Sequence, residues 1–441
     1  MEGELEAIRQ QFLNHALPLL VVGLTLAVRL RSQVELLRFD PSRCADDLLG
    51  MNPVGEGHQI GERRIDRGKL AASDHECLAG PVGRGLLTGV LCALQVTSGQ
   101  SKDSSQAISV SGFVDAYYSK NIADPVSRTN KLRNFDIPEN QINLNLAEIV
   151  LQKKAQPVGF RMDVDFGTAN DVVQGIPPYG TTPYSTLANI QQAFLTGVIR
   201  LGNGLTADVG KFVTHMGYEV IESKDNWNYS RSLLFAWAVP YYHTGLRLTY
   251  PFADNFTVAV HVVNGWNSVI DDNAEKSLGL MVSYSPTGST GFILNVMDGF
   301  EQPSGVDVGK KKVFDFIVTQ NVSDAFALTL NADYGDETLI SGLYTWKGAA
   351  LYGHYAFNPQ SAFALRAEVF DDPQGYATGL GIPRLSVKEV TATYEYKFVD
   401  ALLVRGEARY DFSNAPIFDK RADVNTEIGQ MTILVGVVAM F

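Results

Sequence analysis

The sequence contains no run of roughly 18 apolar residues, the length that a helix needs to cross a membrane. The longest uncharged apolar stretch, residues 16–28, is shorter and contains Pro18. The sequence therefore predicts no membrane-spanning helix. A transmembrane β-barrel is compatible with this absence, because its strands alternate apolar and polar residues and need no apolar run.

Cysteine is scarce. The chain has three, Cys44, Cys77 and Cys92, and none follows residue 92. A body without cysteine suits export to an oxidising compartment, where a stray thiol could mispair. Chance in a cysteine-poor protein is the alternative explanation.

Basic residues are fewer than acidic ones. The net charge is −12, and residues 107–441 hold 25 Lys and Arg against 35 Asp and Glu. A nucleic-acid partner requires a basic face, so this composition argues against one. An acidic balance is common in solvated loops and by itself defines no ion selectivity.

Residues 1–106 lack the strand pattern that the rest of the chain shows. Near their end, Arg84 precedes an apolar segment at 85–96 and the small residues 97–99. A basic residue, an apolar core and small residues in this order are typical of a secretory signal peptide. We therefore expect residues 82–99 to be a signal peptide.

The segment before that signal, residues 1–81, is predicted to be an extension that is either unstructured or precedes the true start of translation. Val82 is the favoured start and Met51 the second choice. A signal at residues 16–28 and a folded N-terminal domain are the alternatives. The residues before 16 are acidic, which is the wrong sign for a signal peptide. The mature domain is expected to span 100–441.

From residue 107 onward, apolar and polar residues alternate in segments of about ten residues. Residues 160–166, Phe-Arg-Met-Asp-Val-Asp-Phe, illustrate the pattern, and residues 256–262 and 402–411 repeat it. This alternation predicts strands with one apolar face. A soluble β-sandwich shows the same alternation, so the connections must distinguish the two folds.

The pattern divides into sixteen strands. We place them near residues 108–119, 140–152, 158–167, 189–201, 204–212, 242–251, 255–264, 276–285, 289–298, 311–321, 324–334, 344–357, 361–370, 386–398, 401–411 and 429–441. Every second connection is tight. The others are longer and polar, from 335–343 to 213–241.

Alternating short and long connections are typical of outer-membrane barrels, which have short periplasmic turns and longer external loops. The sequence thus predicts an all-β fold, a transmembrane antiparallel β-barrel of about 16 strands of the bacterial outer-membrane type. The sheet must close, because each unpaired backbone group in hydrocarbon costs several kcal/mol. An even strand number places both termini in the periplasm.

The chain ends on an aromatic residue, Phe441, at the end of the last strand. Such an ending resembles the signal that the bacterial barrel-assembly machinery reads. Residues 112–118, 211–212, 217–219, 228–232, Pro240 and 243–245 also resemble the OmpL-like β-barrel porin-2 family. The resemblance covers roughly 110–441 and is most specific between 205 and 250. It implies an outer-membrane pore and says little about the solute.

A sixteen-strand barrel is wide enough to leave an aqueous channel. Charged residues at inward positions would line this channel, because burying them in a dry core is costly. The candidates for the pore lining are Arg161, Asp163, Asp165, Asp208, Arg247, Asp333, Arg366, Glu368, Arg405, Glu407 and Arg409. For each of them, an ion pair that braces the wall is the alternative role.

The longest loop, 213–241, combines charges with an apolar segment at 233–238. A purely solvated loop does not need that segment, so we expect part of the loop to pack against the inner wall and narrow the channel. The candidate constriction residues are Glu219, Glu222, Lys224, Asp225 and Arg231. A short helix that caps the external mouth is the alternative.

The predicted function is a porin, which allows passive diffusion of small hydrophilic solutes or ions. A plugged structural or adhesin barrel is the alternative, and an outer-membrane barrel enzyme is a third. The histidines show no metal-ligand spacing, and no G-x-S-x-G nucleophile motif occurs, so we expect no metal, cofactor or catalytic residue. The expected partners are outer-membrane lipids and lipopolysaccharide, the barrel-assembly machinery, small hydrophilic solutes and further copies of the chain in a homotrimer.

Overall fold

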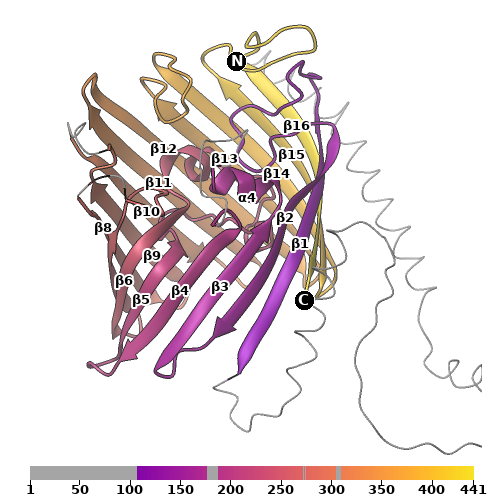
Figure 1. The fold of residues 1–441 in the computed structure, drawn as a ribbon. Helices are drawn as coiled ribbons and strands as arrows, with labels where there is room; N and C mark the ends of the chain where they lie inside the picture. The colour runs from indigo at the N-terminus through magenta and orange to yellow at the C-terminus, as the bar shows by residue number, and fades with distance from the viewer. Residues whose placement is uncertain (1–106, 176–186, 272, 274, 304–308) are drawn as a thin grey trace, which may run out of the picture. The chain divides into compact units, whose positions relative to one another are not determined.

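The computed structural model describes residues 107–175, 187–271, 273, 275–303 and 309–441. In this part of the chain, sixteen antiparallel strands form one closed barrel, and β1 pairs with β16 (Figure 1). The strands are β1 (Ile108–Asn121), β2 (Gln141–Lys153), β3 (Val158–Phe166), β4 (Ile190–Ile199), β5 (Leu205–Val213), β6 (Tyr242–Ala253), β7 (Phe256–Val263), β8 (Ser277–Thr287), β9 (Thr290–Gly299), β10 (Lys311–Asn321), β11 (Phe326–Leu339), β12 (Gly342–Asn358), β13 (Ser361–Asp372), β14 (Leu385–Val399), β15 (Leu402–Ser413) and β16 (Gly429–Met440).

The predicted fold is therefore confirmed. The predicted extension, signal peptide and translation start lie outside the described residues and stay predictions. Within the described residues, no helix is long and apolar enough to cross a membrane.

The strands bury polar side chains and expose apolar ones. In β13, Phe363 and Leu365 are 38% and 45% exposed, whereas Arg366 and Glu368, which follow them and point to the other face, are buried. A water-soluble sheet shows the opposite arrangement. Apolar residues outside and polar residues inside are expected of a barrel surrounded by lipid.

The seam of the barrel involves the last residue of the chain. The backbone N–H of Gly112 donates to the Phe441 carbonyl at 3.2 Å, and the Phe441 N–H donates back at 3.0 Å. A Cβ at Gly112 would lie 2.8 Å from the Phe441 ring and 2.4 Å from the Glu148 carbonyl oxygen, so the ring lies over a site that only glycine leaves free. The start of β1 and the end of β16 lie at the same end of the barrel (Figure 1).

One predicted connection is wrong. We expected an external loop at 335–343, but β11 continues to Leu339 and β12 begins at Gly342, which leaves a turn of two residues. The ladder runs up to the pair Leu339–Gly342. Gly342 has a φ of +132°, which glycine adopts at little cost and which permits so tight a turn.

The interior of the barrel holds hydrophobic packing as well as polar groups. The connection after β3 includes a short helix, α4 (Thr168–Val173), whose Ala169 and Val173 are buried. They belong to a cluster with Ile221 and Phe235 of the loop between β5 and β6. That loop therefore lies inside the barrel wall.

Candidate pore constriction

The loop between β5 and β6, residues 214–241, is called the third loop here. It contains a 3₁₀ turn, η4 (Ser223–Asp225), and a π-helical turn, η5 (Leu234–Ala238). It leaves and re-enters the wall at adjacent strands, yet its hydrogen bonds reach β1, β10, β11 and β12–β15. The third loop therefore spans the interior to the opposite wall.

The middle of the third loop is held by carboxylates of the wall. Glu407 on β15 accepts the backbone N–H groups of Tyr229 and Ser230 at 2.6 and 3.0 Å. Asp115 on β1 accepts the Tyr229 hydroxyl at 2.7 Å. Because two of these three donors are backbone N–H groups, the contacts fix the loop backbone as well as a side chain. Hydrogen bonds to a carboxylate are about twice as strong as those between neutral groups.

A third carboxylate of the wall holds the start of η5. Glu368 on β13 accepts the N–H groups of Leu233 and Leu234 at 2.8 and 2.7 Å. At the other end of the turn, the indole of Trp346 donates to the Ala238 carbonyl at 3.2 Å. The first turn of a helix has unpaired N–H donors, and a carboxylate is their most favourable acceptor.

Three arginines of the wall hold the loop carbonyls. Arg366 donates to the Ser230 carbonyl at 2.7 Å and to Glu219 of the loop at 2.7 Å. Arg405 donates to the carbonyls of Asn226, at 2.6 Å, and Ser223. Arg409 donates to the Arg231 carbonyl at 2.5 Å. Carboxylates of the wall thus accept hydrogen bonds from loop N–H groups, and arginines of the wall donate to loop carbonyls. Both the donors and the acceptors of the loop backbone therefore have partners in the wall.

The eleven residues predicted to line the pore all lie on strands, and nine of them are buried. These nine are Asp163, Asp165, Asp208, Asp333, Arg366, Glu368, Arg405, Glu407 and Arg409. The structure brings the last five together beneath the third loop on β13 and β15. The remaining two, Arg161 and Arg247, have side chains that are 34% and 24% exposed.

The two exposed arginines lie on the other side of the interior, on β3 and β6. Arg161 pairs with Asp163 at 2.9 Å, and Arg247 pairs with Asp208 at 2.8 Å. The side chain of Asp163 is fully buried and that of Asp208 is 8% exposed. In both pairs, the positive partner is the one that reaches water.

The five residues predicted for the constriction have different surroundings. Glu219 is buried against Arg366, and the buried guanidinium of Arg231 donates to the Val220 carbonyl at 2.9 Å. Lys224 and Asp225 form a partly exposed pair, and Glu222 accepts a hydrogen bond from the Gln191 amide at 2.6 Å. Two of the five, Glu219 and Arg231, therefore stabilise the loop itself.

Three histidines that sequence analysis did not single out meet where the third loop leaves the wall. The ring of His215 stacks on His261 with centroids 4.0 Å apart, and His243 lies 5.8 Å from His215. Burial lowers the pKa of His215 to about 3, so this loop side chain is neutral at pH 7. Among the described residues, no group of three or more His, Cys, Asp or Glu side chains could hold a metal ion. Alternation in β6 and β7 indicates that His243 and His261 face inward, but nothing in the sequence indicates His215 as their neighbour.

A closed sixteen-strand barrel with apolar outer and charged inner faces defines a protein of the outer-membrane porin class. Residues 107–441 match the family described as "Putative beta-barrel porin-2, OmpL-like", and the chain belongs to that family. The family assignment made from residues 112–118 and 205–250 is therefore confirmed. No curated protein matches the chain.

Solved outer-membrane proteins share the fold. The channel DcaP of Acinetobacter baumannii is 12% identical, with a TM-score of 0.53 over 78% of this chain and 99% of that one. The anion-selective porin of Comamonas acidovorans is 10% identical, with a TM-score of 0.51 over 76% and 100%. OprB of Pseudomonas putida is 12% identical, with a TM-score of 0.51 over 81% and 97%. At such low identity, the likeness shows the fold alone.

Proposed function

We propose that this barrel is a non-enzymatic channel for passive diffusion of small hydrophilic solutes and ions, and that the third loop is its constriction. The observation that carries the proposal is the attachment of the loop backbone to β13 and β15 through Glu368 and Glu407. A loop fixed across the interior reduces the cross-section that is open to solutes. Both termini are proposed to lie in the periplasm, which would put the long loops outside.

The solute path is proposed to run on the side of the interior formed by β3–β6. There, Arg161 and Arg247 keep part of their surface in contact with water, whereas the charges beneath the third loop do not. Charged side chains that line an aqueous path set an electrostatic barrier for ions of the same sign. Oligomerisation as a trimer is a further expectation, which cross-linking in intact outer membranes would test.

A plugged barrel is the second candidate, because one observation favours it. Apolar side chains of the wall, such as Phe212, Val263 and Met297, form one buried cluster with Leu233 and Leu234 of the third loop. Packing of this kind excludes water from part of the interior. The two candidates differ in whether any continuous water path is left.

Single-channel recording of the purified protein in planar bilayers separates the candidates. A porin gives stepwise conductance in KCl, whereas a plugged barrel gives almost none. Deletion of residues 219–232 is expected to raise the conductance. A folded deletion variant with unchanged conductance rejects the constriction, and a silent wild type beside a conducting deletion variant identifies the loop as a plug. A difference in migration between unheated and heated protein on a denaturing gel verifies that each barrel has folded.

A further inference from the structure

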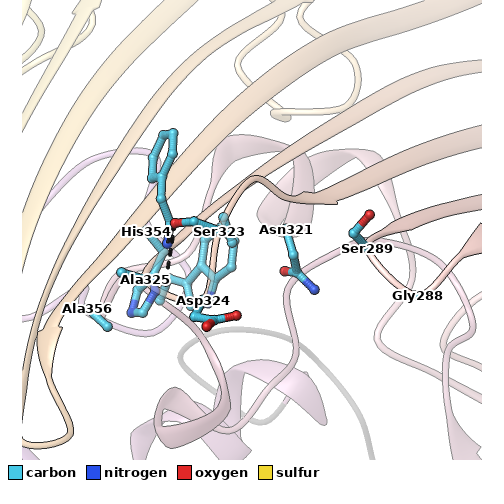
Figure 2. A pocket seen from close by; sticks show the side chains of 11 residues that line it. Gly288, Ser289, Asn321, Ser323, Asp324, Ala325, His354 and Ala356 are labelled. Atoms are coloured by element: carbon cyan, nitrogen blue, oxygen red, sulfur yellow. Dashed lines mark hydrogen bonds between the residues drawn. The ribbon is translucent and has the colours of Figure 1, made fainter.

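A cavity of about 550 Å³ lies where the turns after β8 and β10 approach β12 and the third loop, and Figure 2 shows residues that line it. We call it the rim pocket. Its functional groups come from separate elements: Trp227 from the third loop, Ser289 and Asp324 from the two turns, Asn321 from the end of β10 and His354 from β12. Ligand sites in proteins typically have volumes of about 300–1,000 Å³, so the rim pocket has room for one or two sugar rings.

The aromatic side of the rim pocket is rigidly mounted. The indole of Trp227 stacks on His354 with centroids 5.1 Å apart and an interplanar angle of 23°. The residues on both sides of it are tied to the wall, since Asn226 accepts from Arg405 at 2.6 Å and Asn228 donates to Thr393 at 2.8 Å. A preorganised aromatic group loses little conformational entropy when a ligand binds.

The polar side of the rim pocket has unused hydrogen-bonding capacity. Within the described chain, the side chains of Asn321, Asp324 and His354 line the cavity and make no hydrogen bond with another residue; Asn321 and Asp324 are exposed and His354 is half-buried. Ser323 differs, because its hydroxyl already accepts the N–H groups of Ala325 and Phe326. An amide, a carboxylate and an imidazole that converge on one cavity can donate to and accept from neighbouring hydroxyl groups.

We propose that the rim pocket binds a small neutral saccharide. A sugar ring has an apolar face that can pack on an aromatic side chain and a perimeter of hydroxyl groups that can bond to Asn321, Asp324 and His354. A neutral saccharide can use the amide of Asn321 and the imidazole of His354 as well as the Asp324 carboxylate, whereas an organic cation would use only Asp324 and the aromatic ring. The proposal deepens the proposed diffusion function, since it assigns a solute class to the same interior.

Isothermal titration with D-glucose tests the rim pocket without requiring conduction. The full chain is folded in a detergent that carries no sugar headgroup, and sorbitol serves as the comparison, because it has hydroxyl groups but no ring. We expect glucose to bind with a millimolar Kd, sorbitol at least about tenfold more weakly, and Trp227→Ala to raise the glucose Kd at least about tenfold. Trp266→Ala, outside the pocket, is the matched control and should keep the wild-type Kd. Asn321→Ala, a smaller change in the same lining, should weaken glucose binding without altering the loop.

Three results would overturn the saccharide site. They are no heat of binding for glucose on the order of 0.1 M, equal affinity of wild type and folded Trp227→Ala, or tighter binding of tetramethylammonium than of glucose. The channel proposal fails separately. A protein that gives no conductance in bilayers but binds glucose contradicts the channel proposal and supports the saccharide site. A protein that conducts but does not bind glucose supports the channel and contradicts the saccharide site.

Discussion

Replacing Arg366 with methionine should release the third loop while leaving the barrel wall intact. The guanidinium is fully buried and donates to Glu389 on the wall at 2.6 Å, and to Glu219 and the Ser230 carbonyl of the loop at 2.7 Å each. Methionine has a similar length but no donor. The substitution therefore leaves the Glu219 carboxylate buried without its cation, and no ladder hydrogen bond of β13 is affected.

The expected loss follows from these contacts. Removing one partner of a buried ion pair costs about 3–5 kcal/mol, because the remaining charge stays desolvated and unpaired. Three of the five hydrogen-bond acceptors of Arg366 belong to the loop, namely Glu219 and the carbonyl and hydroxyl of Ser230, so the larger part of this free energy is lost from loop docking rather than from barrel folding. Since about 1.4 kcal/mol corresponds to a tenfold change in an equilibrium constant, the undocked fraction should rise by at least about a hundredfold.

Two measurements separate undocking from its effect on the channel. Trypsin should cleave the folded Arg366→Met variant at Lys224 of the third loop much faster than it cleaves wild type. In bilayers, the variant should show a larger mean conductance and more open-channel noise. In both measurements, Arg366→Lys should give values between those of wild type and Arg366→Met, because a lysine keeps the charge but cannot form the forked contacts of a guanidinium.

The matched control is Lys420→Met, which removes one positive charge from the exposed ion pair with Glu427. It should leave both readouts at the wild-type level. A folded Arg366→Met variant with wild-type proteolysis would refute the role of Arg366 in docking. Faster proteolysis with unchanged conductance would instead refute the constriction.

Three further predictions concern single residues. Glu368→Gln should weaken loop docking by about 1–3 kcal/mol, because an NH₂ group replaces one of the two oxygens that accept the Leu233 and Leu234 N–H groups and leaves one of these buried donors without an acceptor; thermal unfolding followed by circular dichroism measures the loss. Gly112→Ala should destabilise the seam by about 1–3 kcal/mol through clashes with the Glu148 carbonyl oxygen and the Phe441 ring, so an unchanged urea midpoint for unfolding contradicts that packing. Arg247→Gln should move the reversal potential in a KCl gradient towards cation preference, because it removes a water-exposed positive charge and leaves Asp208; a shift towards anions speaks against a path along β6.

Period-2 alternation was sufficient to predict the strands, because the side-chain pattern of a strand depends only on neighbouring residues. The barrel was predicted from the alternation of short and long connections between them. The same rule failed at 335–343, where Gly342 allows strand pairing to continue through a two-residue turn. Gly and polar residues are common to loops and to tight turns, so composition could not distinguish a loop from a turn there. The apolar segment 233–238 did indicate that the third loop packs inward.

The partners of the third loop could not be predicted, because they depend on the closed barrel. Glu368 and the backbone N–H of Leu233 are 135 residues apart in the chain, and Glu407 and Tyr229 are 178 apart. Only the strand order and the register bring these groups together. The contact between His215 and His261 depends in the same way on the course of the loop.

Inward charges do not by themselves indicate a wet lumen. Beneath the third loop, the cost of burying Arg366, Arg409 and Glu368 is offset by ion pairs and by loop backbone groups. A buried, ion-paired interface and an aqueous wall therefore leave the same alternating pattern in a sequence. Ion preference should accordingly follow the few charges that keep contact with water, Arg161 and Arg247 first, and not the total number of inward charges. Because the carboxylate partners of both arginines are less exposed than the guanidiniums, we expect an ion on the proposed path along β3–β6 to meet positive charge first, although the net charge of the chain is negative.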